Sequence, residues 1–108
     1  MNTPKENSKE WTKDPNYPIR VLYDDGDYTI IWGKHYDTPV LASRWSLTNE
    51  DGKPHWHIEP NFIATAILQR LLTFAIDRPN YGYYDNILFA ISELNNQVAP
   101  IDNPEDYK

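Results

Sequence analysis

Apolar and polar side chains alternate in short runs between residues 18 and 59, and polar turns separate the runs. Alternation with a period of two is typical of β-strands that bury one face. The pattern predicts four strands, over residues 19–23, 28–32, 38–47 and 55–59. Asp-Gly pairs at 25–26 and 51–52 indicate tight hairpin turns, and residues 33–37 form the remaining connection. Consecutive strands joined in this way predict an antiparallel meander.

The period changes to that of a helix after Pro60, a residue favoured in the first turn of helices. Apolar residues at 63, 67, 71 and 74, with 64, 68, 72 and 75 alongside, predict a helix over 62–76 that is buried on more than one side. Asp85 is the expected N-cap of a second helix, whose apolar face carries Ile87, Leu88, Ile91 and Leu94. We therefore expect an α+β fold, a four-stranded antiparallel meander followed by two helices packed on one face.

The polar ends of the chain lack this periodicity. We expect residues 1–17 to form a flexible N-terminal arm with one anchor at Trp11, and residues 98–108 to form a C-terminal tail. Residues 18–97 are then a single α+β domain, since 108 residues suit one small core.

Charge and composition narrow the range of partners. The net charge is −6, from sixteen acidic and ten basic residues, and no basic stripe is visible, so no nucleic-acid partner is expected. The chain has no cysteine, and it has no apolar run of the roughly 20 residues that a membrane span needs. The polar N-terminus lacks a secretion signal, so we expect a cytoplasmic protein without membrane contact.

The fourth predicted strand holds the most suggestive polar cluster. Alternation would place His55, His57 and Glu59 on one face, and Trp56 and Ile58 on the other. Two imidazoles and a carboxylate suit zinc, with His35 as a further ligand, and they also suit an acid–base pair or a pocket for a small ligand. A solvated strand face explains the same pattern, and no cofactor is expected.

Aromatic residues are the other prominent feature, with four tryptophans and eight tyrosines. Trp32, Trp45 and Trp56 fall on three successive predicted strands, where cross-strand pairs would stabilise the sheet. The alternative is a binding surface, because aromatic side chains are enriched at the centres of interfaces. Three tyrosines around one glycine, at 81–84, favour a contact surface in that loop.

The favoured function is a small acidic, non-enzymatic protein-binding domain of the accessory, inhibitor or immunity type. It would use an aromatic and acidic surface to bind a protein partner, and the aromatic excess adds the expectation of a homodimer. The alternative is a small-ligand or metal-binding protein, with or without enzymatic activity, built on the His55/His57/Glu59 strand face. The expected binding residues are Tyr81, Tyr83, Tyr84, Trp45, His55, His57 and Glu59.

Overall fold

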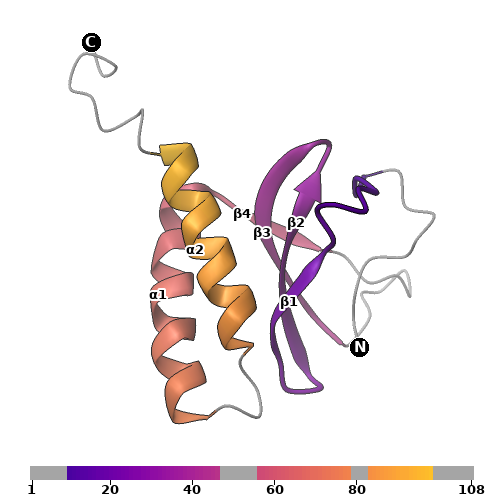
Figure 1. Ribbon diagram of the computed structural model, residues 1–108. Helices are drawn as coiled ribbons and strands as arrows, with labels where there is room; N and C mark the ends of the chain where they lie inside the picture. Colours follow the sequence, from indigo (N-terminus) through magenta and orange to yellow (C-terminus); the bar gives the residue numbers. More distant parts are fainter. Residues whose placement is uncertain (1–9, 47–55, 79–82, 99–108) are drawn as a thin grey trace.

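Four strands and two helices make up the part of the chain that the computed structural model describes, residues 10–46, 56–78 and 83–98. The elements are β1 (Arg20–Asp24), β2 (Tyr28–His35), β3 (Thr38–Trp45), β4 (His57–Glu59), α1 (Asn61–Asp77) and α2 (Tyr84–Val98). The strand order is β1-β2-β3-β4, and every neighbouring pair is antiparallel. Both helices lie on the same face of the sheet, hereafter its inner face (Figure 1). The predicted α+β meander with two helices on one face is confirmed.

The main core lies between the inner face and the helices. Alternation along the strands turns Ile30 and Trp32 of β2 and Leu41 of β3 toward the helices. The helices contribute one buried stripe each, made up of Ala64, Leu68, Leu71, Ala75, Ile87, Ala90 and Leu94. No helix in the described ranges is both long and apolar enough to cross a membrane.

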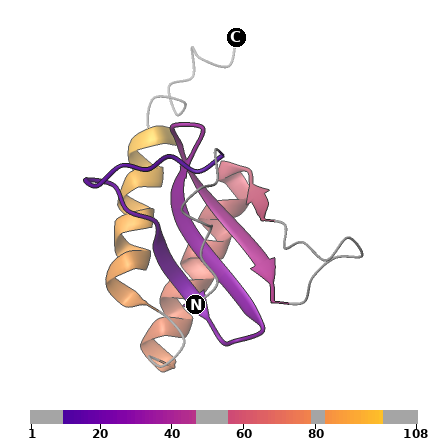
Figure 2. The same cartoon turned by 90° about the vertical axis from the view of Figure 1, so that its right-hand side faces the viewer.

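A second, smaller core covers the outer face of the sheet. Trp11, only 4 % exposed, packs there with Val21, Ile31 and Ala42, so the expected anchor of the arm is buried. The arm crosses the sheet at the upper end of the strands in Figure 2. It is held by the Thr12 N–H, which donates to the Lys34 carbonyl at 2.8 Å, and by a β-bridge between Trp11 and His35.

The connection between the second and third strands is shorter than the sequence predicts. Gly33, expected to begin that connection, lies inside β2, and the turn consists only of Tyr36 and Asp37 at positive φ. Gly33 serves packing instead, because a Cβ there would lie 3.0 Å from an Ile19 side-chain carbon and 3.4 Å from the Trp11 ring. The φ values of 48° and 67° match a two-residue hairpin turn, which glycine or asparagine usually signals.

Both helices differ slightly from the prediction. Pro60 is the N-cap of α1 rather than its first residue, and α2 begins at Tyr84, so Asp85 lies in its first turn instead of at the cap. The expected burial of the first helix on more than one side is wrong. Its fully buried residues form one stripe, while Phe62 is 78 % and Ile76 65 % exposed, because nothing in the described part of the chain covers the face of α1 that points away from the sheet.

A β-bulge in β1, which the pattern did not predict, sets the direction of Tyr23. The register passes from Val21 opposite Ile31 directly to Tyr23 opposite Ile30. The extra residue, Leu22, lets Leu22 and Tyr23 both contribute to the main core, since a bulge redirects the side chain that follows it.

Candidate functional site

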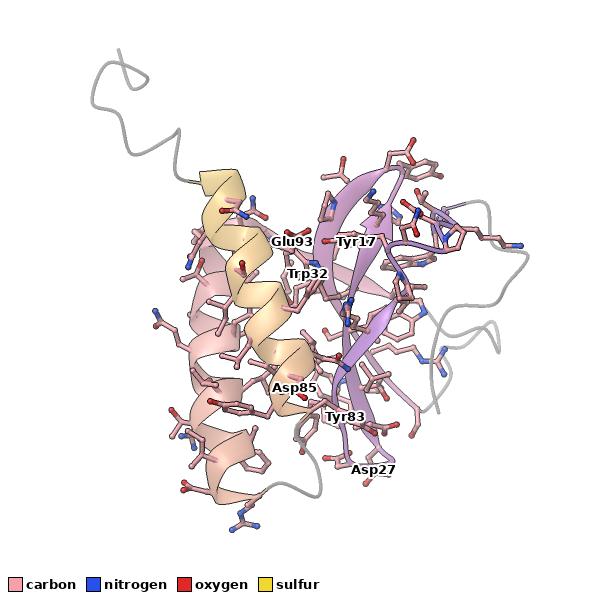
Figure 3. The ribbon with its side chains drawn as sticks, viewed as in Figure 1. Tyr17, Asp27, Trp32, Tyr83, Asp85 and Glu93 are labelled. Atoms are coloured by element: carbon pink, nitrogen blue, oxygen red, sulfur yellow. The ribbon has the colours of Figure 1, made fainter. Side chains whose placement is uncertain are left out.

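Acidic and aromatic side chains gather at one end of the molecule, the lower end in Figure 3, where the β1–β2 turn and the start of α2 lie. We call this region the acidic–aromatic end and define it by Asp27, Tyr28, Trp45, Tyr83, Tyr84 and Asp85. Figure 3 shows Asp27 at the tip of the turn, with Tyr83 and Asp85 beside β1. Asp24 at the end of β1 and Asp25 in the turn add further negative charge, and α1 ends at the same side of the molecule with Asp77 followed by the basic Arg78.

The β1–β2 turn owes its shape to two of its own carboxylates. Asp25 Oδ1 accepts the backbone N–H groups of Asp27 and Tyr28, each at 2.8 Å, and Asp25 Oδ2 accepts the Tyr23 hydroxyl at 2.7 Å. These bonds, led by the one from Tyr23, hold the pKa of the Asp25 carboxyl below its ordinary value. Asp24 Oδ1 accepts the Gly26 N–H at 2.9 Å in the same way. Both side chains are therefore occupied within the turn.

Asp27 differs from these two neighbours. Its carbonyl accepts the Ser46 N–H at 2.7 Å, which places it next to the end of β3. Within the described ranges, its carboxylate has no hydrogen-bond or ion-pair partner. Asp27 is exposed to solvent, and its backbone pairs with Ser46 and not with Trp45.

Trp45 is the most exposed tryptophan of the described residues, at 62 %. It lies directly opposite Tyr28 in the β2–β3 register, and their ring centroids are 4.6 Å apart at 52°. This cross-strand contact fixes the indole while leaving most of its surface in water.

The start of α2 brings a second pair of aromatic rings to the same end. The Tyr83 N–H donates to the Leu22 carbonyl at 3.1 Å, so the bulge in β1 holds the segment that leads into the helix. Tyr83 is 38 % and Tyr84 47 % exposed. Tyr81, the third tyrosine expected to bind, lies outside the described residues.

The arrangement of His55, His57 and Glu59 that the sequence predicts on the fourth strand is seen only for His57 and Glu59. His57 and Glu59 share the inner face of β4, and His57 Nε2 lies 3.2 Å from Glu59 Oε1, with His57 72 % exposed. Trp56 lies on the opposite face, in contact with the outer core and Trp11. His55 lies outside the described residues.

His35 does not join this face. It lies opposite Thr38 at one end of β3, whereas His57 lies opposite Ser43, five positions along the strand and about 17 Å away. Its ring packs on Trp11, with centroids 5.2 Å apart. No group of three metal-ligating side chains occurs among the residues that the structure describes.

The register brings the two predicted sites together. His57 lies opposite Ser43, and Trp45 is two residues farther along β3 on the same face. Diagonal neighbours of this kind are about 7–8 Å apart, within reach of long side chains. The His57–Glu59 pair therefore borders the acidic–aromatic end and is not a separate site.

A further cluster of interacting side chains, which includes Tyr17 of the N-terminal arm, was not expected from the sequence. Trp32 Nε1–H donates to the Tyr17 hydroxyl at 2.8 Å, and the hydroxyl is also hydrogen-bonded to Glu93 of α2 (Figure 3). Burial and the Glu93 carboxylate raise the pKa of Tyr17 to about 12. The neighbouring segment, residues 11–15 and 17–19, lines a mostly apolar pocket of about 460 Å³. No periodicity marks this cluster, because its members come from three distant segments.

Comparison of the chain with protein-family models, with curated proteins and with solved structures found no match in any of the three.

Proposed function

We propose that this protein is a non-enzymatic binding domain that attaches to another protein through its acidic–aromatic end. The observation that carries the proposal is the exposure of Trp45, whose ring packs on Tyr28 at the end of the molecule that also carries Asp27 and Asp85. Solvation of a large indole is unfavourable, and exposed aromatic rings with a polar rim are typical of the centres of protein interfaces. The lack of cysteine agrees with the cytoplasm as the place of action.

A different protein suits this surface better than a second copy of the chain. A symmetric dimer through this end would bring Asp27 and Asp85 of one copy toward the same residues of the other. Like charges in contact disfavour association, whereas a partner with a basic surface is attracted. The molecular mass of the protein in solution tests this point. A homodimer that dissociates on the substitution Trp45→Ala would show that this surface binds a second copy of the chain.

The experiment is capture of partners from native lysate on the immobilised full chain. We expect a partner that the wild type retains and that Trp45→Ala and Tyr84→Ala lose, because each substitution removes an exposed ring from the centre of the surface. Phe62→Ala is the matched control, since Phe62 is 78 % exposed but lies in the first turn of α1, at its opposite end from Asp77.

Folding of each variant is checked by thermal unfolding. Trp45→Ala removes one cross-strand pair and should cost about 1 kcal/mol or less. Partners that bind Trp45→Ala and Tyr84→Ala as well as they bind the wild type would contradict the proposal.

A further inference from the structure

We propose that the protein forms a weak symmetric dimer in which β4 pairs antiparallel with β4 of a second copy, so that the two sheets join into one. This inference is independent of the proposed function, because it concerns the edge of the sheet and leaves the acidic–aromatic end free. It follows from a comparison of the two edges of the sheet and from the charges that β4 carries.

The two edges of the sheet differ in how the chain covers them. On the β1 side, residues at the start of α2 bond two strand carbonyls, through the Tyr83 N–H and the Asn86 amide. The N-terminal arm continues along the same side of β2, where the Thr12 N–H donates to the Lys34 carbonyl. On the other side, β4 has no backbone hydrogen bond or β-bridge to any described residue beyond its pairing with β3. Free N–H and C=O groups on an edge strand are a template for a further strand.

The length of β4 fixes how two copies can pair. The strand has three residues, and Pro60, which has no N–H, follows it as the N-cap of α1. A symmetric antiparallel pair that uses the whole strand therefore places Ile58 of one copy opposite Ile58 of the other. His57 of each copy then lies opposite Glu59 of the other copy, and this contact occurs twice because of the two-fold axis.

The charges of β4 are self-complementary in this register. His57 and Glu59 share the inner face, and within one chain His57 Nε2 lies 3.2 Å from Glu59 Oε1. The second carboxylate oxygen of Glu59 has no partner among the described residues, although this side chain is only 14 % exposed. The dimer offers that oxygen the imidazole of the other copy. Unlike charges directly opposite each other stabilise a strand pair, whereas like charges destabilise it.

The same pairing keeps the acidic–aromatic ends of the two copies apart. In each copy Ser43 lies opposite His57, and Trp45 is two residues farther toward the acidic–aromatic end. Because the paired strands run antiparallel, the His57 end of one β4 lies beside the Glu59 end of the other. The two acidic–aromatic ends therefore point in opposite directions, and their like charges are not brought into contact.

Sedimentation equilibrium of the full chain tests the dimer. The concentration should range from about 10 µM to about 1 mM, because an interface built on so short a strand is small and weak. We expect the mean mass to rise with concentration from the chain mass of 12.7 kDa toward twice this value. Trp45→Ala should leave the rise unchanged, because Trp45 lies outside the paired strands. A monomer over the whole range would overturn the inference.

Two charge variants identify the strand that pairs. His57→Glu places like charges opposite each other and Glu59→Lys removes the attraction, so each variant alone should associate about tenfold more weakly than the wild type. In an equimolar mixture of the two variants, unlike charges again face each other at both contacts, so association should return. A folding defect in either variant cannot produce this recovery. Gln69→Glu is the matched control, since it adds a negative charge on the exposed face of α1 and should leave the mass unchanged.

A mixture that associates no more strongly than either variant alone would contradict pairing through β4, as would a wild-type dimer that His57→Glu leaves intact. A dimer that dissociates with Trp45→Ala would also contradict it, because self-association would then belong to the acidic–aromatic end.

Discussion

The missing side chain at Gly33 decides where the N-terminal arm lies. Trp11 and Ile19 close over this position, and a Cβ would meet Ile19 at 3.0 Å and the Trp11 ring at 3.4 Å. Gly33 is buried in the middle of a regular strand, so its role is close approach and not backbone freedom. One residue thus couples β2 to a segment more than a dozen positions away.

Gly33→Ala should lower the free energy of unfolding by about 1–3 kcal/mol, because an added methyl group overpacks this contact. Urea unfolding measures the change. Part of the cost should disappear in the Trp11→Ala background, where the ring that meets the methyl group is gone. An equal cost in both backgrounds would show that Trp11 does not press on this position.

Tyr17 makes the free energy of unfolding depend on pH in the alkaline range. Folding raises the pKa of Tyr17 from 10.0 to about 12, because burial and the Glu93 carboxylate disfavour the phenolate. Its contribution to stability is therefore complete below pH 10 and is lost as the pH rises toward 12. Unfolding measured across this range should show a smaller alkaline loss in Tyr17→Phe than in the wild type. Identical pH profiles would place Tyr17 in a less buried environment.

At the scale of elements, the start of α2 protects the edge strand β1. The Asn86 side-chain amide donates to the Val21 carbonyl at 2.9 Å, and the Tyr83 N–H donates to the Leu22 carbonyl at 3.1 Å. Arg20 Nη1 also reaches Asn86 Oδ1 at 3.5 Å. These bonds satisfy carbonyls at the bulge that an exposed edge strand would otherwise offer to another chain.

Asn86→Ala should lower stability by about 1 kcal/mol and speed hydrogen exchange of the β1 amides, because a part-buried carbonyl loses its donor. Asn95→Ala is the matched control, since Asn95 lies on the exposed face of the same helix. Equal effects of the two substitutions would contradict the protective role of Asn86.

The elements that the sequence predicted well are those with strong periodicity. Alternation and the Asp-Gly turn located β1, β2 and β3, and the change of period after Pro60 located α1. The bulge in β1 escaped prediction, because Leu22 and Tyr23 are both apolar enough to belong to either face. The sequence did not predict the two-residue turn at Tyr36 and Asp37. The hydrogen bonds between Asp37 and Thr12 at this turn form only when the N-terminal arm is folded against it.

The sequence pointed to three of the six residues that define the candidate site, and it did not show that they lie on one surface. Trp45, Tyr83 and Tyr84 were expected to bind, yet only the strand register and the bulge place them at one end with Asp27. Nothing in the sequence distinguishes Asp27 from Asp24 and Asp25. The distinction comes from hydrogen bonds that engage two of the three carboxylates.

At the scale of the whole molecule, the two ends of the sheet differ in character. At the arm end, aromatic rings such as Tyr17 are packed and covered by basic side chains such as Lys34. At the acidic–aromatic end, Trp45 and Tyr84 remain exposed on the part of the molecule that also carries Asp27 and Asp85. The first arrangement stabilises the fold, and the second is the surface through which we propose that the protein binds a positively charged partner.

The indole N–H spectrum in the presence of a captured partner shows whether Trp45 lies in the interface. The chain has four tryptophans, of which Trp11 and Trp32 are buried and serve as internal references. We predict that the partner shifts or broadens the Trp45 indole signal and leaves those of Trp11 and Trp32 in place. A partner that binds the full chain tightly without changing the Trp45 signal would contradict it.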